Sequence, residues 1–222
     1  MSERKTPTSP RIKFFGRLRF PRLEEPKPFE AGGVPRWEAT FILDPTNPQQ
    51  AAGIKDLLES AAALCKEHYG KVPLAIKKLA VTFIPGTHKL DLNDEKNAPD
   101  DIRVFCFQDG SAEKWKNYAG YKGNFVVASN AKRLRPDVAN RAGKAVKKGE
   151  PEYPYEGANV RGSVDFWLLM GQSAQKTGRL LGCNLIGVQF ASDNTAFSQD
   201  RIEDEFEALE EVPPTEAVSA FD

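Results

Sequence analysis

Apolar and polar residues alternate over several short stretches of the chain, and this pattern predicts β-strands. Between Arg11 and Phe20 apolar side chains recur at every second position, the period of a strand with one buried face. The opposite face is basic and holds one aromatic residue: Arg11, Lys13, Phe15, Arg17 and Arg19. Apolar, β-branched stretches bounded by turn residues predict further strands at residues 36–43, 79–84, 103–107, 124–129, 160–170 and 180–190.

One amphipathic helix is predicted between the second and third of these strands. Asn47 is its expected N-cap, Pro48 takes the first helical position, and Gly70 is the stop signal. Apolar residues between them fall on one helical stripe: Ile54, Leu57, Leu58, Ala61 and Cys65.

Two long segments lack a clear apolar period and are predicted to be loops. Residues 21–35 are rich in proline and glutamate and contain the turn residues Gly32 and Gly33. Residues 131–155 are rich in lysine, arginine, proline and glycine, so we expect a long, mobile, basic excursion outside the core.

Six or seven short strands with one early helix favour a small barrel over a parallel α/β sheet, which would need several helices. We predict a mainly β fold, an elaborated oligonucleotide-binding (OB-fold) barrel of five to seven strands with long loops, over residues 1–199. A β-sandwich is the alternative. Residues 200–222 are predicted to form a disordered acidic tail.

The formal net charge of zero hides a strong division of charge along the chain. The segment from Asp200 to Asp222 holds nine acidic residues and one basic residue, a net charge of −8. The remaining residues hold 30 bases and 22 acids, which leaves +8 before residue 200. A basic body attracts polyanions, and an acidic tail repels or imitates them.

Basic and aromatic residues are interleaved in the predicted loops as well as on the first strand. Proteins that bind single-stranded nucleic acid need cations that follow the phosphates and aromatic faces on which bases stack. The candidate DNA-binding residues are Lys13, Phe15, Arg17, Arg19, Lys114, Trp115, Lys116, Tyr118, Tyr121, Lys122, Lys132, Arg133, Arg135, Tyr153 and Tyr155. Alternatively, Trp115 and the tyrosines cover the end of the barrel and the lysines are merely solvated. Phe14, Phe41, Phe83 and Phe166 lie on apolar faces and are assigned to the core.

The acidic tail intersperses apolar residues among its carboxylates and finishes with Phe221 and Asp222. A linear motif of this kind suits a basic, apolar pocket on a partner, and the same carboxylates could compete with DNA for the basic groove. A tail that only aids solubility is the alternative. The candidate partner-binding residues are Glu203, Asp204, Glu205, Phe206, Glu207, Phe221 and Asp222.

Catalytic and metal-binding motifs find little support in the sequence. The phosphate-binding, nucleophile-elbow and HExxH motifs are absent, so we expect no enzyme activity and no cofactor. Cys65 and His68 lack a second pair of ligands at zinc spacing, and the three widely spaced cysteines are expected to be reduced. A metal-dependent nuclease or other DNA-processing enzyme remains the alternative, through the acidic loop residues Asp91, Asp94, Asp100 and Asp101.

Several stretches resemble the bacteriophage single-stranded DNA-binding proteins of the Enterobacter-phage type. These stretches are RIKFFGRLRFPRL, NFVVASNAKRLRPDV, VRGSVDFWLLM, LLGCNLIGVQF and the closing AFD. The resemblance implies an elaborated OB-fold that binds single-stranded DNA without sequence preference in phage replication, recombination or repair. It also implies that the acidic tail contacts replication or recombination proteins, although Val212–Ala220 is less acidic than the family's terminal run.

The location of the protein and its assembly are less constrained. No stretch approaches the roughly 18 apolar residues that a membrane span needs, and the polar first ten residues do not resemble a signal sequence. We therefore expect the cytoplasm, which by the resemblance is that of a bacterial host. The sequence predicts no oligomeric state.

Overall fold

The computed structural model describes residues 6–28, 30–84 and 102–194, and its centre is a closed β-barrel. Five strands form the barrel: β1 (Ile12–Lys27), β2 (Arg36–Leu43), β5 (Phe125–Ala131), β7 (Asn159–Leu168) and β8 (Arg179–Ser192). β1 pairs with β2 and β7, β2 pairs with β5, and β7 pairs with β8, all antiparallel. A parallel bridge between Asn130 and Asn184 joins β5 to β8 and closes the ring. This arrangement confirms the predicted OB-fold barrel.

Three short strands extend the sheet beyond the barrel. β3 (Ile102–Val104) and β6 (Asp137–Ala139) pair with β8 on either side of the bridge from β5, while β4 (Phe107–Asp109) pairs with β5. The strand predicted at residues 103–107 is therefore divided between β3 and β4. The one long edge of β8 is covered by three segments in turn, which leaves little of it free to pair with another chain.

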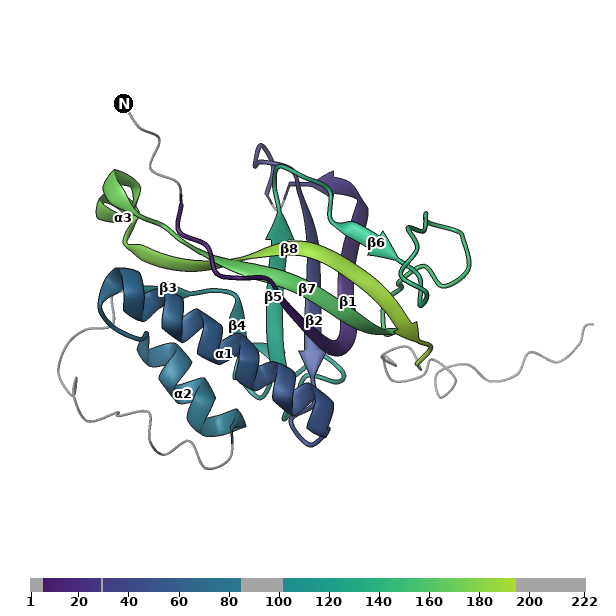
Figure 1. Ribbon diagram of the computed structural model, residues 1–222, viewed down its shortest axis with the longest axis horizontal. Coiled ribbons are helices and arrows are strands. Elements are labelled where there is room, and N and C mark those ends of the chain that lie inside the picture. Colours follow the sequence, from purple (N-terminus) through teal and green to yellow (C-terminus); the bar gives the residue numbers. More distant parts are fainter. Residues whose placement is uncertain (1–5, 29, 85–101, 195–222) are drawn as a thin grey trace, which may run out of the picture.

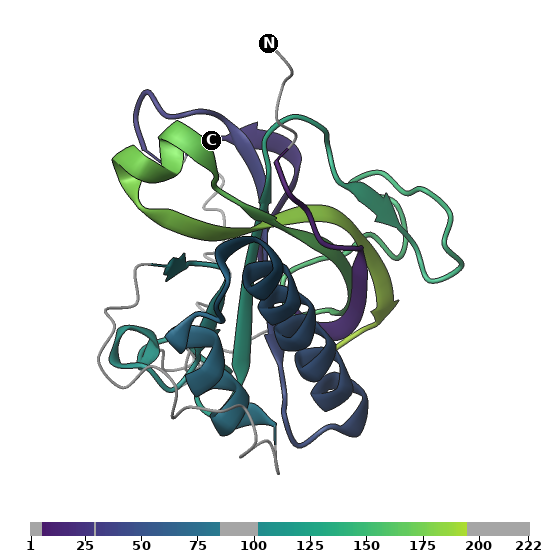
Figure 2. The ribbon, with the colours of Figure 1, turned by 60° about the vertical axis from the view of Figure 1, so that its left-hand side comes forward.

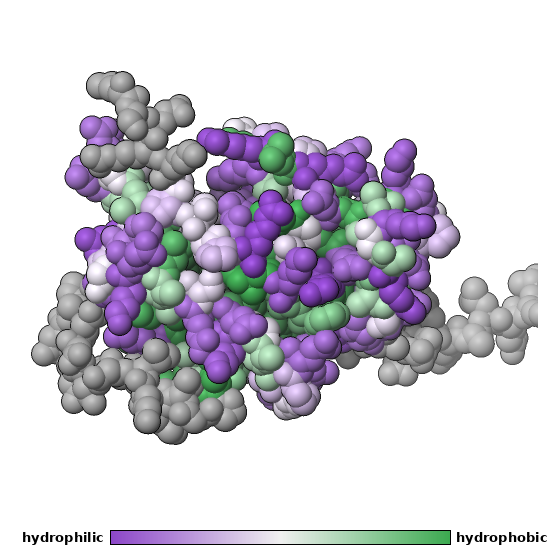
Figure 3. All heavy atoms as spheres, viewed as in Figure 1, coloured by the Kyte–Doolittle hydropathy of each residue, from purple (hydrophilic) through white to green (hydrophobic). Residues whose placement is uncertain are grey.

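Two helices, α1 (Pro48–Tyr69) and α2 (Leu74–Phe83), lie together on one side of the barrel (Figures 1 and 2). The Asn47 side chain accepts hydrogen bonds from the backbone of Gln49 and Gln50, and Gly70 ends α1 in the left-handed conformation, as predicted. α1 packs against β1, β2 and β7, and α2 packs against α1 and β4. Hydrophilic side chains cover most of the face seen in Figure 3, and apolar side chains show between them around its centre.

The prediction of a strand at residues 79–84 is wrong, because residues 79–83 belong to α2 and Ile84 is its C-cap. Its buried residues are Ile76, Leu79, Ala80 and Phe83, which recur at helical spacing once the window begins at Leu74. The β-branched residues Val81 and Thr82 suggested a strand, but both lie exposed on the outer face of the helix. Packing of the apolar stripe against α1 outweighs their weak preference for strands.

Two predicted loops are more ordered than expected. β1 continues to Lys27 through a bulge between Arg19 and Arg22, so the loop predicted from residue 21 starts later. In the 131–155 segment, β6 pairs with β8, and Val138 and Val146 are buried in the core. That segment therefore contributes to the core, contrary to the prediction.

The core fills the barrel and the space beneath α1. Phe14 and Phe41 pack edge to face with their ring centroids 5.0 Å apart, and Phe107 joins Phe125 to Phe166. Phe83 of α2 packs on Phe125, so the four phenylalanines assigned to packing all lie in the core. Cys65, Cys106 and Cys183 are buried thiols outside any disulfide, in line with the prediction that they are reduced, and burial raises the pKa of Cys106 and of Cys183.

Candidate nucleic-acid interface

A groove with a volume of ≈ 980 Å³ runs over the outer face of β2 and β5. Its walls come from β1 at Phe20–Arg22, from the residues that precede β4, and from the β7–β8 ribbon at Trp167 and Leu180–Cys183. In OB-folds, oligonucleotides and oligosaccharides bind to the face of the second and third barrel strands, between the loops that join strands one to two and four to five. β2 and β5 are the second and third barrel strands here, so the groove occupies that position.

Four aromatic side chains line the groove: Phe20, Phe105, Trp115 and Trp167. Phe105 is the most open of them, with 59% of its surface exposed, and the Arg103 guanidinium lies 5.5 Å from its ring centroid. The Arg103 guanidinium also donates a hydrogen bond to the Thr177 carbonyl, which links β3 to the β7–β8 connection. An exposed ring beside a cation is the arrangement that binds a base and its phosphate together.

Three cations accompany these rings: Arg22, Arg36 and Lys132. Both arginines form ion pairs with Glu38 on β2, with 3.2 Å between Arg22 Nη1 and Glu38 Oε2. Lys132 is exposed and has no ion pair among the described residues. The lining also holds two carboxylates, Glu38 and Glu156, so its three cations leave a net charge of about +1, and Glu38 holds both arginines in position.

Phe20 reaches the groove because of an irregularity in β1. Its φ angle is +49°, in the left-handed region that non-glycine residues rarely adopt, and it precedes a proline. Between Arg19 and Arg22 the pairing with β2 shifts by one residue, so this is a β-bulge that turns the Phe20 side chain outward. The ring is 43% exposed, with the Arg19 guanidinium 4.7 Å from its centroid. Strain of this kind concentrates at functional sites.

Trp167 lies flat across the neighbouring strand at Gly182, its direct partner in the β7–β8 ladder. A Cβ atom at residue 182 would stand 2.2 Å from Trp167 Cε2, so the indole occupies the space that any other side chain would fill. The glycine thus fixes the ring against the floor of the groove, with one face on the sheet.

The aromatic loop, residues 111–124, folds onto the outside of the barrel beside the groove. Trp115 stacks on Tyr121 with 5.0 Å between ring centroids, and Tyr118 packs edge to face against both Trp115 and Phe20. Tyr121 forms a second, smaller apolar cluster with Ile42 and Val126, and Trp115 packs against this cluster. Tyr121 is fully buried there, so the prediction that it stacks on bases is wrong: its ring serves packing. Burial raises its pKa to about 12.

Three predicted lysines lie on the aromatic loop. Lys114, Lys116 and Lys122 are exposed, with the Lys114 ammonium 5.0 Å from the Trp115 ring centroid and Lys116 paired with Glu113. Tyr118 keeps 39% of its surface exposed. Trp115 has Tyr121 on one side and Lys114 beside it, so the alternative of an aromatic cover over the barrel holds for part of this set.

The predicted cations of β1 divide between two surfaces. Arg19 pairs with Glu156, at 2.6 Å between Nη1 and Oε1, and joins the Phe20 side of the groove. Lys13, Phe15 and Arg17 lie farther back along β1, on the face that β1 shares with β7. Burial, with Arg19 nearby, lowers the pKa of Arg17.

The remaining predicted DNA-binding residues lie within residues 131–155, the segment that contains β6. Arg133 is exposed, whereas Arg135 donates to the Leu23 carbonyl and pairs with Glu24, which anchors the segment to β1. Tyr153 is half-buried against the core, and Tyr155 donates a hydrogen bond to Asp193 at 2.9 Å. Burial raises the pKa of Tyr153 to about 12. Arg135 and Tyr153 thus have structural contacts that account for their positions.

Sequence reasoning missed most of the groove: Phe20, Arg22, Arg36, Phe105, Gln108 and Trp167. Strict alternation around the core residue Phe166 would have placed Trp167 on the outer face of its strand. No local signal marks Phe20, because its outward position depends on a bulge in the pairing with β2.

The described residues contain no candidate metal cluster, and the acidic candidate segments are not among them. Among residues 6–28, 30–84 and 102–194, no three or more His, Cys, Asp and Glu side chains form a cluster that could hold a metal ion. Cys65 faces the core while His68 is exposed beside Glu67. Asp91, Asp94, Asp100, Asp101 and the tail candidates lie outside the described residues. No described helix is long and apolar enough to cross a membrane.

The fold is similar to solved structures of one phage protein. The single-stranded DNA-binding protein from bacteriophage Enc34, in complex with single-stranded DNA, aligns with a TM-score of 0.60 and 20% identity over 85% of this chain and 89% of that one. The same Enc34 protein in a second structure aligns at 0.55, with 19% identity over 89% and 90%. No family model and no curated protein sequence matches the chain. The chain therefore shares the fold of the single-stranded DNA-binding protein of bacteriophage Enc34.

Proposed function

We propose that this protein binds single-stranded DNA without sequence preference, in the groove over β2 and β5. The observation that carries the proposal is the convergence of four aromatic rings and three cations in that one groove. The rings come from β1, from the segment before β4, from the aromatic loop and from β7, so the barrel itself assembles the set. Stacking platforms within a basic groove are what sequence-tolerant binding of single strands requires.

In the proposed complex, Arg22, Arg36 and Lys132 follow the phosphates while Phe105 and Trp167 stack on bases. Every base offers a π-face, so stacking favours no particular sequence, and each stacked base contributes about 1 to 3 kcal/mol. The exposed residues Lys114, Lys116, Tyr118 and Lys122 of the aromatic loop, with Arg19 of β1 beside Phe20, would extend this contact. The Enc34 structure in complex with single-stranded DNA has the same fold, which supports this class of ligand.

The acidic segment from Asp200 to Asp222 is proposed to regulate this binding and to recruit partners. Its net charge of −8 opposes the +8 of the rest of the chain, so it would compete with DNA for the groove. Phe221 beside Asp222 would serve as the apolar anchor for replication or recombination proteins of a phage.

A salt titration tests the proposal. Binding of a fluorescein-labelled oligo-dT is followed by anisotropy at increasing salt, and the affinity should fall with a log-log slope of about −0.7 for each neutralised phosphate. An affinity that is independent of salt would contradict phosphate tracking. Cleavage of the same oligonucleotide in magnesium or manganese would favour the nuclease alternative.

Substitution of two exposed apolar residues, one in the groove and one outside it, tests the location of the site. Phe105→Ala should weaken oligo-dT binding by roughly tenfold, which corresponds to the loss of about one stacked base. Leu134→Ala is the matched control, because Leu134 is 81% exposed and lies outside the groove lining. Equal affinities of the two variants would remove the groove from the proposal.

A further inference from the structure

A second basic surface lies on the outer face of the sheet formed by β1, β7, β8 and β6. Two rows of paired residues cross it: Lys13, Ser163, Gly187 and Asp137 in one row, and Phe15, Arg161, Gln189 and Ala139 in the other. Small residues at the centre, Ser163 and Gly187, leave a hollow of ≈ 230 Å³ in the sheet face. We name this surface the β7 face.

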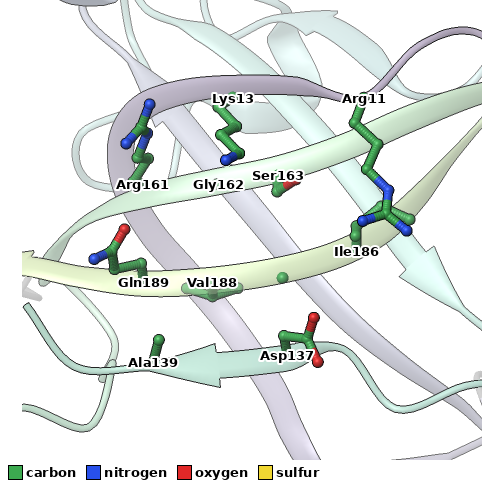
Figure 4. Close-up of a pocket in the computed structure, with 11 residues that line it drawn as sticks. Arg11, Lys13, Asp137, Ala139, Arg161, Gly162, Ser163, Ile186, Val188 and Gln189 are labelled. Atoms are coloured by element: carbon green, nitrogen blue, oxygen red, sulfur yellow. The ribbon is translucent and has the colours of Figure 1, made fainter. Parts of the chain in front are cut away.

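Cations surround the hollow. Figure 4 shows Lys13 and Arg161 standing over β7, and the Arg11 side chain reaching across toward Ile186 on β8. All three side chains are exposed, and the Arg161 guanidinium lies 5.6 Å from the centroid of the Phe15 ring. Asp137 is the one carboxylate in the lining of the hollow, so the local charge is about +2.

The hollow is better suited to an anionic group carried by a flexible polymer than to a small molecule that the protein would have to enclose. It is shallow, and its cations come from the start of β1 and from β7 without a ring of acceptors to fix a base edge. Guanidinium and ammonium groups on an open surface bind phosphate through charge-assisted hydrogen bonds.

The β7 face and the groove lie on the same side of β7. Burial alternates along this strand, and Arg161, Ser163, Asp165 and Trp167 all point away from the core. Ser163 precedes Trp167 by four residues, a rise of about 13 Å. Asp165 lies between them, where its carboxylate accepts a hydrogen bond from Asn184 at 2.7 Å and is near Arg11. A strand that stacks on Trp167 can therefore continue toward Lys13 and Arg161.

We infer that the β7 face is a second contact surface for the sugar-phosphate backbone of single-stranded DNA, reached only by strands longer than the groove holds. The inference rests on the proposed function of the groove. The acidic segment of this chain could present the same chemistry, but the β7 face lies in line with Trp167, which favours the strand already bound in the groove.

The test compares two lengths of oligonucleotide on two full-chain double variants. Labelled oligo-dT of about 5 nucleotides fills the groove, and one of about 16 nucleotides can extend beyond it. Lys13→Ala with Arg161→Ala removes two cations of the β7 face. Lys66→Ala with Lys78→Ala removes the same charge from exposed positions on α1 and α2 and serves as the control. Thermal unfolding checks that all chains are folded.

The expected result is selective for length. The β7-face variant should bind the short oligonucleotide within about twofold of wild type and the long one about tenfold more weakly, with a salt slope shallower by about 1.4. The control should match wild type at both lengths.

Other results overturn the inference. Equal losses at both lengths, or losses equal to the control, would show that the face makes no separate contact. A gain in affinity that disappears in a chain ending at Gln199 would make the β7 face the binding site of the acidic segment. Failure of the wild-type chain to bind either oligonucleotide would refute the proposed function itself, which is a distinguishable result.

Discussion

At the scale of single residues, Phe20 combines an unfavourable backbone conformation with an exposed ring. A φ of +49° costs about 1 to 2 kcal/mol for a residue with a Cβ, and the exposed position of the ring returns little of it through burial. The bulge that holds Phe20 makes sense if the ring contacts a ligand in the groove.

The variants Phe20→Gly and Phe20→Ala separate the backbone from the ring. Both should weaken oligo-dT binding by about fivefold to tenfold, because both remove a stacking face. Phe20→Gly should be the more stable of the two by up to about 1 kcal/mol, since glycine adopts positive φ without strain. Anisotropy and urea unfolding measure the two effects. Full affinity in either variant would exclude the ring from the interface.

Asp165 is the residue with a testable dependence on pH. Burial raises the pKa of its carboxyl, although the Asn184 amide and Arg11 act in the opposite direction. An acid whose pKa is higher in the folded state stabilises the fold below its unfolded pKa, and loses that contribution as the pH rises through its folded value.

Asp165→Asn should therefore raise the stability of the chain at neutral pH, by less than about 1 kcal/mol because the side chain is half exposed. The difference from wild type should shrink at a second, acidic pH below the ordinary pKa of an aspartate, where the wild-type carboxyl takes up its proton. Urea unfolding at both values measures it. A stability difference that is constant with pH would show that Asp165 titrates normally.

At the scale of elements, the β7–β8 ribbon depends on one exact pairing, that of Trp167 with Gly182. Gly182→Ala would place a methyl group 2.2 Å from the indole, so the ring must leave its position. We expect a loss of stability of about 1 to 3 kcal/mol and weaker oligo-dT binding. Intrinsic tryptophan fluorescence should report the displaced ring.

The double variant Gly182→Ala with Trp167→Ala supplies the control for this pairing. Once the indole is absent, the added methyl group has space, so the double variant should bind no more weakly than Trp167→Ala alone. Additive losses would mean that Gly182 acts on the groove by another route.

The helices and strands also show which features of the fold can be predicted from neighbouring residues alone. The N-cap, Pro48 and Gly70 located α1 to within a residue, because caps and apolar spacing act among near neighbours. α2 was misassigned because its β-branched outer residues resembled a strand, and only its packing on α1 distinguishes the two. The extension of β1 was missed because a bulge interrupts the alternation at Phe20.

At the scale of the whole molecule, opposite charges are divided between the barrel and the acidic segment. A chain that ends at Gln199 should bind oligo-dT more tightly at low salt, roughly tenfold, and the difference should fade as the Debye length shortens. Anisotropy titrations on the two chains at two salt concentrations measure this. An unchanged affinity at low salt would refute competition by the acidic segment and leave partner recruitment open.

Phe221→Ala in the full chain is the matched control, because it keeps every charge. Its affinity for DNA should equal that of wild type at all salt concentrations. A tighter complex would mean that the Phe221 ring, as well as the carboxylates, lies against the groove.

Most of the strands, the first helix, the basic body and the acidic segment can be predicted from the sequence, because period, caps and charge are properties of neighbouring residues. Which aromatic residues meet depends instead on the folded chain. Phe20, Phe105 and Trp167 are distant in sequence. They meet in one groove because of the bulge in β1, the break between β3 and β4, and the pairing of Trp167 with Gly182. Tyr121, which stacks on Trp115 in the aromatic loop, is buried against Ile42 and Val126 and therefore lies outside the candidate interface. Burial depends on contacts across the whole fold, and no local pattern contains them.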